Sequence, residues 1–188
     1  SKEIVKAEIL DDVGRLVTIW YRQDDAGDGV VVRKVERHDE TLYELTLPSE
    51  LNGNRVVAIG ESACRDDSKI TRVTFPETVR YIADNAFRNC GALTDVVFPN
   101  SLTYIEKFAF YGCSDLREIA LPDTVSYVGY GAFAGCAAVQ EIKFPSTFKS
   151  IEAGAFSGCG LLTSLTFPET LTYIGYGAFA GCVKLESL

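Results

Sequence analysis

The chain has 188 residues and a formal net charge of −8, and its 47% hydrophobic and 23% charged residues exclude a disordered, collagen-like or coiled-coil protein. It has no basic stripe, so nucleic acid is a poor partner, and no apolar run reaches the roughly 18 residues of a membrane span, so we predict no membrane insertion. The single histidine, His38, excludes Ser–His–Asp triads and metal sites built from several imidazoles.

The N-terminal segment, residues 1–41, is predicted to be a β-rich cap. Residues 16–21 and 30–35 are rich in β-branched and aromatic side chains and are separated by a turn-rich loop, which favours a β-hairpin. Residues 1–12 fit either a short helix or a strand. The end of a repeat array exposes an apolar patch and free strand edges. We therefore expect the hairpin to cover the first coil, with Trp20 as its anchor.

The loop at residues 23–29 contains three aspartates and two glycines. A calcium loop of the D-x-[DN]-x-[DN]-G type needs an oxygen ligand at position 26, where this chain has Ala26. We interpret the loop as a solvated hairpin turn and predict no metal. His38 lies among charged residues, which indicates a solvated linker rather than a catalytic base.

An imperfect repeat unit begins at residue 42, and its apolar positions recur 28 residues later. The aligned residues are Leu42, Leu45, Leu47 and Pro48 against Ile70, Val73, Phe75 and Pro76. An insertion at about residues 52–55 accounts for the extra length. In this unit Cys64 stands in a column that is otherwise Phe, and Asp67 stands in a column that is otherwise Cys.

From Pro76 onward the sequence repeats every 23 residues, and several columns stay in register. They include Pro76, Pro99, Pro122, Pro145 and Pro168; Cys90, Cys113, Cys136, Cys159 and Cys182; and Phe87, Phe110, Phe133, Phe156 and Phe179. The unit reads L-x-x-I-x-F-P-x-T-L-x-x-I-x-x-x-A-F-x-G-C-x-x. A unit of this length cannot bury its own apolar face, whereas stacked units bury all of their faces together. Residues 42–188 therefore predict a solenoid of about six coils.

Each coil is predicted to contain one strand and one short helical turn. Residues 93–98 alternate toward their end and stop at Pro99, which lacks a donor N–H, so we expect a strand that stacks into a parallel sheet. Ala132-Phe133 followed by Gly135-Cys136 suits a short helical turn that ends at glycine. The predicted fold class is therefore an α/β repeat protein.

The A-F-x-G-C core followed by L-x-x-I-x-F-P resembles the leucine-rich repeats of the bacterial surface-antigen type, also called BspA-like or treponemal. Residues 47–60 look like the usual first repeat of that family, and the resemblance covers about residues 42–188. Cys64 and Asp67 depart from the pattern. The resemblance implies a right-handed, curved solenoid on secreted or surface proteins of host-associated bacteria, with binding roles such as adhesion rather than catalysis.

The cysteine column is predicted to be structural. Successive coils place neighbouring thiols roughly 5 Å apart, but parallel side chains have poor geometry for bridging. Zinc sites usually use C-x-x-C spacing, which the sequence lacks. We expect reduced, buried thiols and no cofactor.

A hydroxyl column is expected to satisfy backbone groups at the bend after each strand. No base lies in register with it, so we predict no catalytic nucleophile. Its members are Thr78, Ser101, Thr124, Thr147 and Thr170.

The candidate binding residues form a tyrosine column, which consists of Tyr81, Tyr104, Tyr127 and Tyr173 and is interrupted by Ser150. Each tyrosine precedes the inward Ile or Val of its coil, so we expect its ring to face outward. Exposed Tyr is large, stiff and amphipathic, which suits contacts with protein or sugar. The alternative is that the rings only support one another between coils. The strand face has mixed charges and few candidate anchors.

The residues themselves indicate only a non-enzymatic scaffold, and the family resemblance implies a secreted or cell-surface module that binds a protein in an adhesion-type role. The expected partner lies on a host or neighbouring cell, and a glycan is the second candidate. The chain contains no signal peptide, and no cap follows the last repeat, which predicts a piece of a longer protein. The alternative function is a passive spacer or carbohydrate-facing module within a larger surface enzyme. An enzyme in its own right is opposed by the missing base and pocket.

Overall fold

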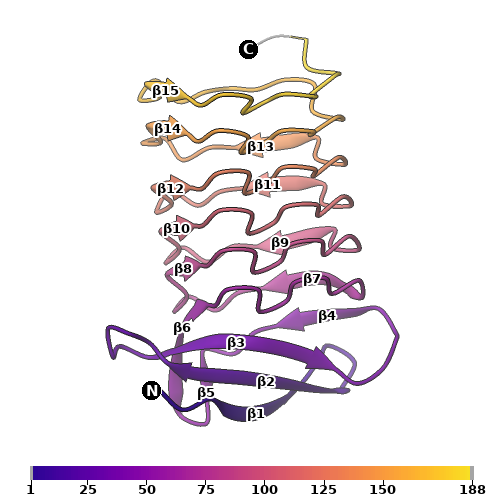
Figure 1. Cartoon of the computed structure of the whole chain (residues 1–188), viewed down its shortest axis with the longest axis vertical. Coiled ribbons are helices and arrows are strands. Elements are labelled where there is room, and N and C mark those ends of the chain that lie inside the picture. The colour runs from indigo at the N-terminus through magenta and orange to yellow at the C-terminus, as the bar shows by residue number, and fades with distance from the viewer. Residues whose placement is uncertain (1, 187–188) are drawn as a thin grey trace.

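The computed structural model describes residues 2–186, which form a β-solenoid of about six coils with a β-sheet at its N-terminal end (Figure 1). The last two positions of the predicted solenoid, residues 187–188, lie outside the described residues. Two columns of short strands run along the solenoid, one on the left and the other nearer the centre and right in the view of Figure 1.

The first column contains the predicted repeat strands, and the neighbours within it that pair do so in parallel. Its strands are β4 (Tyr43–Thr46), β7 (Ile70–Thr74), β9 (Asp95–Val97), β11 (Glu118–Ala120) and β13 (Glu141–Lys143). Val73 pairs with both Leu45 and Val96, and Ile119 pairs with Ile142. The predicted strand within residues 93–98 is confirmed in a shorter form, since β9 ends two residues before Pro99.

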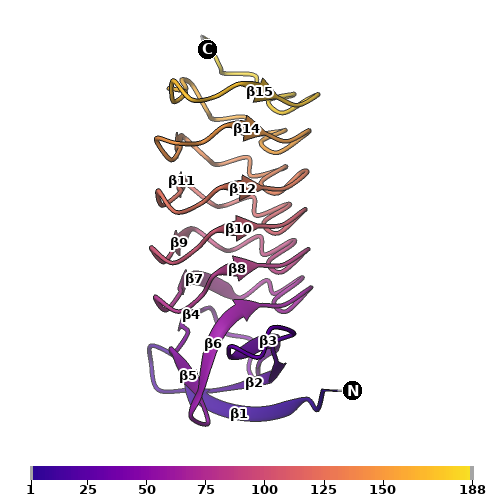
Figure 2. The ribbon, with the colours of Figure 1, turned by 90° about the vertical axis from the view of Figure 1, so that its left-hand side faces the viewer.

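A second column of two-residue strands is also parallel, and no signal in the sequence indicated it. Its strands are β8 (Tyr81–Ile82), β10 (Tyr104–Ile105), β12 (Tyr127–Val128), β14 (Ser150–Ile151) and β15 (Tyr173–Ile174). This column faces the viewer in Figure 2. Its pairing is interrupted between β12 and β14. The interruption coincides with Phe148, which fills a buried position that is Val or Leu in the neighbouring coils.

The α/β fold class is wrong, because the described residues contain no helix. The predicted helical turns are tight turns in which alternate amides donate between coils. Phe133 N–H donates to Ala155 O at 2.8 Å, and Gly135 N–H donates to Ser157 O at 2.7 Å. Gly135 also has a φ of +75°, which a right-handed helix cannot accommodate. Stacking of the coils therefore uses the amides that a helix would need.

The core between the two strand columns contains a stack of phenylalanine rings. Adjacent rings have centroids 5.2 to 5.7 Å apart and lie within 9° of parallel. The stacked residues are Phe87, Phe110, Phe133, Phe156 and Phe179. This stack confirms the inward position that the 23-residue period predicts.

The cysteine column lies beside the phenylalanine stack, and all six cysteines of the chain are free and buried, as predicted. Each thiol of the column donates to the carbonyl of a residue in the Phe column of the preceding coil, at S···O distances of 3.1 to 3.8 Å. For Cys90 the acceptor is Cys64 O, which confirms that Cys64 occupies the Phe column.

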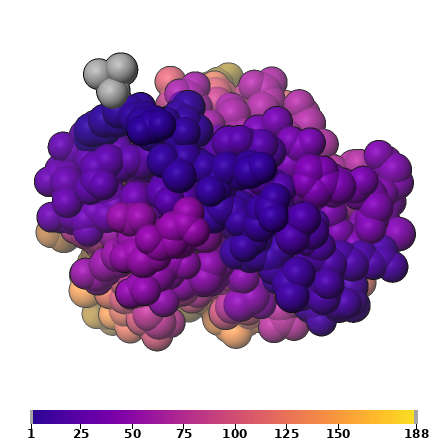
Figure 3. Space-filling model, turned by 90° about the horizontal axis from the view of Figure 1, so that it is seen from below, coloured from indigo at the N-terminus to yellow at the C-terminus, as the bar shows by residue number. Residues whose placement is uncertain are grey.

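The N-terminal segment forms β1 (Val5–Leu10), β2 (Leu16–Gln23) and β3 (Val30–Arg37), which pair antiparallel. The predicted hairpin is β2–β3, and the undecided residues near the N-terminus form a strand. β3 continues in parallel onto β6 (Asn54–Ile59), so the sheet joins the second strand column. Seen from below, N-terminal residues form most of the end surface of the molecule (Figure 3).

Trp20 does not anchor the hairpin to the first coil, so that prediction is wrong. Ile19 and Tyr21 point into the core instead, because side chains alternate along a strand. Trp20 lies on the opposite face, only partly buried, with Lys34 Nζ 4.8 Å from its ring centroid.

The alignment of Leu42 with Ile70 is also wrong. The register shifts between Tyr43 and Glu44, so Tyr43 pairs with Ile70 and is buried, whereas Leu42 is 62% exposed. An irregularity of this kind moves a side chain to the other face of a strand and cannot be deduced from spacing alone.

The predicted insertion in the first unit is a β-hairpin between β5 (Glu50–Leu51) and β6. Its turn residues, Asn52 and Gly53, have φ values of +50° and +78°. Asn-Gly is the preferred pair for a two-residue hairpin turn with two positive φ angles. The insertion therefore adds a local hairpin and leaves the coil that follows in register.

Candidate functional site

The four predicted tyrosines lie on the outer side of the second strand column, and we refer to them together as the tyrosine face. Tyr104 pairs in register with both Tyr81 and Tyr127, while the inward neighbours Ile82, Ile105 and Val128 are buried. The short parallel strands thus hold the rings at one position per coil.

Exposure differs along the tyrosine face. Tyr104 and Tyr173 are 48% and 54% exposed, whereas Tyr81 and Tyr127 are partly buried. The rings of Tyr104 and Tyr127 are 6.5 Å apart at an interplanar angle of 61°. The rings are therefore both outward-facing and in contact with each other, so geometry is compatible with a binding role and with mutual support.

The hydroxyls of Tyr81 and Tyr127 stay neutral well above physiological pH, because the pKa of each is raised. Burial, followed by the charge of Asp24, raises the pKa of Tyr81 to about 12. Burial also raises the pKa of Tyr127, with a further contribution from Glu106. Neutral phenols donate hydrogen bonds and present apolar ring faces, which are the properties that recognition of another protein uses.

The loop between β2 and β3 reaches the tyrosine face, and sequence spacing did not indicate this contact. Tyr81 OH donates to Asp24 Oδ1 at 3.1 Å, and Arg80 forms an ion pair with Asp28 at 3.2 Å. Between this loop and Tyr104 lies a hollow of about 230 Å³, which we call the loop groove. The repeat period places the tyrosines in one column, but it contains no information on how the non-repetitive hairpin docks. The solvated turn predicted for this loop is corrected in one respect, because Asp24 is buried.

The strand face offers less to a partner. Its hollow, between Arg72, Asp95 and Glu118, has a volume of about 170 Å³ and no aromatic lining residue. Lys143 already forms an ion pair with Glu118 at 2.9 Å. Charges of both signs and the lack of large anchors agree with the low rank that the sequence assigned to this face.

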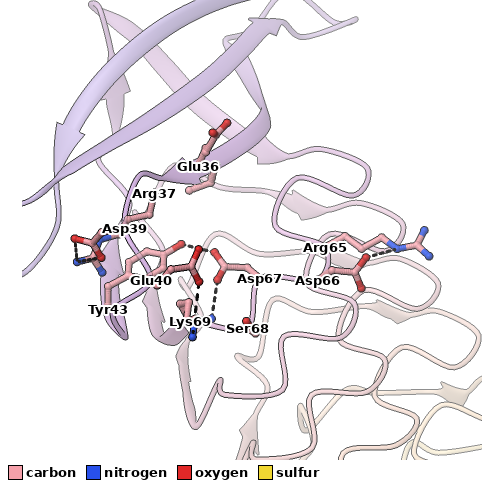
Figure 4. Close-up of a pocket in the computed structure, with 11 residues that line it drawn as sticks. Glu36, Arg37, Asp39, Glu40, Tyr43, Arg65, Asp66, Asp67, Ser68 and Lys69 are labelled. Carbon is pink, nitrogen blue, oxygen red and sulfur yellow. Dashed lines mark hydrogen bonds and ion pairs between the residues drawn. The ribbon is translucent and has the colours of Figure 1, made fainter.

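Another hollow, of about 270 Å³, lies where the N-terminal segment meets the first coil (Figure 4). Its polar groups are largely used by neighbours. Tyr43 OH donates to Asp67 at 2.5 Å, and the other oxygen of Asp67 accepts from the Lys69 amide at 2.9 Å. Buried Arg37 lies 3.2 Å from the buried carboxylate of Asp11. The two hydrogen bonds of Asp67 explain why Asp stands in the Cys column here. Together these contacts stabilise the junction between the N-terminal segment and the first coil, and they leave few polar groups for a ligand.

The hydroxyl column has the structural role predicted for it in at least two coils. Ser101 Oγ donates to Val79 O at 2.6 Å, and Thr170 Oγ1 donates to Phe148 O at 2.8 Å. Within residues 2–186 no group of three or more His, Cys, Asp and Glu side chains could hold a metal ion. No helix in the same part of the chain is long and apolar enough to cross a membrane.

Comparison with known families gives one match over most of the chain. The family model described as the BspA type leucine rich repeat region matches residues 57–186 in six copies. Comparison with curated proteins gives no match.

Several solved bacterial structures resemble the chain. A leucine-rich repeat protein of T. pallidum is 28% identical with a TM-score of 0.67, and the match covers 89% of this chain and 87% of that protein. A leucine-rich repeat protein of Bacteroides ovatus is 29% identical with a TM-score of 0.65, covering 89% of this chain and 50% of that one. The pneumococcal vaccine antigen PcpA shares the fold at 20% identity and a TM-score of 0.69, covering 93% of this chain and 47% of the antigen. The chain thus spans most of the first protein and about half of the other two.

Proposed function

The chain belongs to the BspA-type leucine-rich repeat family, and we propose that it is a non-enzymatic module whose tyrosine face binds a protein partner in an adhesion-type role, outside the cell or at the cell surface. Leucine-rich repeat folds generally mediate protein interactions. The fold by itself does not identify the partner, so the proposal depends on the surface.

The observation that carries the proposal is the row of outward tyrosines on a rigid strand column. Tyr is enriched among residues that dominate binding energy, and its ring loses little conformational entropy on binding. One tyrosine per coil also lets several weak contacts act together on an extended partner. The strand face lacks such anchors.

The finer features of the fold are part of the same proposal. We expect a right-handed solenoid over residues 42–188 and a cap over residues 1–41, as the family resemblance and the predicted hairpin imply. In the alternative function, the chain is a passive spacer or carbohydrate-facing module in a larger surface enzyme.

The test is adhesion of fluorescent beads coated with the chain to cultured epithelial cells and to bacterial cells. The double variant Tyr104→Ser, Tyr127→Ser removes two anchors, and Ser150 shows that a coil in this chain accepts Ser in that column. The double variant Arg72→Ser, Arg117→Ser on the strand face is the matched control. We expect at least a tenfold loss of bead adhesion for the first variant, little change for the second, and nearly unaltered melting temperatures for both.

Three further outcomes would contradict the proposal. A large drop in melting temperature with unchanged adhesion would show that the tyrosines only support one another. Adhesion that survives protease treatment of the target cells but disappears after glycosidase treatment would favour the carbohydrate-facing alternative. Coated beads that adhere no better than uncoated beads would favour the passive spacer.

A further inference from the structure

The loop groove lies at the junction of the repetitive and non-repetitive parts of the molecule. Its lining includes Asp24 and Ala26 of the β2–β3 loop, Val57 of β6, and Arg80, Tyr81 and Tyr104 from the tyrosine side. In Figure 1 this loop projects on the same side as the column from β8 to β15. The groove therefore continues the tyrosine face toward the N-terminal end.

The loop wall of the groove is held in place from several directions. The buried carboxylate of Asp24 accepts one hydrogen bond from Tyr81 OH at 3.1 Å and another from the Ala26 amide at 3.3 Å. Asp28 holds the next part of the loop through its ion pair with Arg80 at 3.2 Å. Lys2 Nζ donates to the main-chain oxygen of Asp24 and lies 3.1 Å from Asp25 Oδ1. A wall fixed in this way costs little entropy to order when something binds.

The size of the groove indicates what it can take. Sites for small molecules usually enclose about 300–1,000 Å³, and the loop groove, at about 230 Å³, is smaller. A volume below that range suits a single large side chain of a protein partner, which is the usual form of an interface anchor.

The chemistry of the walls selects the kind of side chain. Tyr81 and Tyr104 offer aromatic rings, Ala26 is an exposed apolar residue of the lining and Val57 a buried one, and the Arg80 guanidinium is a cation that the negative face of a π-system attracts. The polar groups of the loop are already engaged, since Asp24 is bonded twice and Asp28 is paired with Arg80. Sugar hydroxyls would find few free partners here, whereas an aromatic ring needs none.

We propose that the loop groove receives one aromatic side chain, Phe or Tyr, from a protein that lies along the tyrosine face. This inference rests on the proposed function and specifies the partner chemistry that the site recognises. It assigns a binding role to the β2–β3 loop, in particular to Ala26, which is exposed and lines the groove.

The experiment is a titration of the isotopically labelled 188-residue chain, followed by NMR, with N-acetyl-phenylalaninamide as the probe. N-acetyl-leucinamide, N-acetyl-lysinamide and cellobiose are titrated in parallel. We expect saturable shifts at the amides of Ala26, Val57 and Thr103, with millimolar affinity for the aromatic probe and at least fivefold weaker binding of the other three. Ala26→Trp fills the groove with its own ring and should abolish the shifts.

The matched control is Ala137→Trp, which places the same ring on an exposed turn of a distant coil and should leave the titration unchanged. Unsaturable or scattered shifts, equal binding of the leucine probe, tighter binding of cellobiose, or full binding by Ala26→Trp would each overturn the inference. The two proposals fail separately. If Tyr104→Ser, Tyr127→Ser reduces bead adhesion while Ala26→Trp has normal adhesion and normal probe binding, the tyrosine face remains the binding surface and the loop groove is not part of it.

Discussion

Phe133 is the residue on which the regularity of the core can be tested most directly. Its ring is fully buried between Phe110 at 5.2 Å and Phe156 at 5.7 Å, with both neighbours nearly parallel. Phe133→Ala should lower the free energy of unfolding by about 3–5 kcal/mol, because truncating a buried Phe removes its transfer energy and leaves a cavity. Urea denaturation measures the loss. Tyr176→Ala, at a ring that is 94% exposed, is the control and should leave the midpoint unchanged. A midpoint for Phe133→Ala equal to that of the parent would contradict the stacked core.

The buried thiols make stability depend on alkaline pH. Burial raises the pKa of Cys113 from 9.0 to about 12. In the unfolded chain this thiol ionises near pH 9, whereas in the folded chain it stays neutral. Its burial therefore contributes fully below pH 9, and the contribution is lost as the pH rises toward 12. We expect the difference in melting temperature between the parent and Cys113→Ala to shrink from pH 8 to pH 11. A difference that stays constant over this range would show that the thiol is not buried in its neutral form.

The same scale shows what the sequence could predict about single residues. The 23-residue period predicts that the columns of Phe133 and of the cysteines face inward, and their burial confirms this. Leu42 and Trp20 were misplaced because they lie outside the regular repeats. The register shift beside Tyr43 moves Leu42 out of the buried column. Strand alternation turns Trp20 to the outer face, where it contacts Lys34.

At the scale of elements, the turn around each cysteine depends on backbone conformation rather than on helix propensity. Gly135 has a φ of +75°, and a Cβ at this position would make only ordinary contacts with Gly112, at 3.4 Å. The cost of Gly135→Ala is therefore the left-handed conformation itself, about 1–2 kcal/mol of unfolding free energy. Gly91→Ala is the matched control, since Gly91 does not have a positive φ and a Cβ there would lie 3.6 Å from Ser114 Oγ. Thermal unfolding should show a clear loss for the first variant and a change within about 0.5 kcal/mol for the second. Equal effects would mean that the turn does not require positive φ.

The elements also show why part of the fold escaped prediction. The strand within residues 93–98 has local alternation and a proline behind it, and these signals are readable. The second column has strands of only two residues, such as Tyr104–Ile105, which are too short to show a period. The Gly-Cys pair of each repeat predicts a helical turn, but the amides of Phe133 and Gly135 donate to carbonyls of the next coil. Only the stacked structure determines which of these two hydrogen-bond patterns forms. The same holds for the candidate site, because the tyrosine column follows from the repeat, whereas the contact of Asp24 with Tyr81 follows from docking of a non-repetitive hairpin.

At the scale of the whole molecule, the stability of the solenoid should depend on its N-terminal sheet. Ile19 and Tyr21 of β2 belong to the same buried cluster as Leu45 and Val56 of the first coil. In a repeat array each coil is stabilised mainly by its neighbours, so loss of the end layer destabilises the coil beside it and then the rest. A capping role for residues 1–41 is therefore a prediction that can be tested.

Two substitutions on adjacent residues of β2 test this role. Ile19→Asp places a charge in the buried interface and should cost on the order of 3–5 kcal/mol, as an uncompensated buried charge does. Trp20→Asp places the same charge on the outer face, where Trp20 pairs in register with Lys6 and Lys34, and should be tolerated. The readout is mass spectrometry of thiol alkylation in increasing urea. For Ile19→Asp we expect Cys90 to react at lower urea than Cys159, because unfolding spreads from the damaged end. Identical urea profiles for the two variants would mean that the N-terminal sheet does not stabilise the coils. Alkylation of all five column thiols at the same urea concentration would mean that the coils unfold as a single cooperative unit, and that unfolding does not spread from the N-terminal sheet.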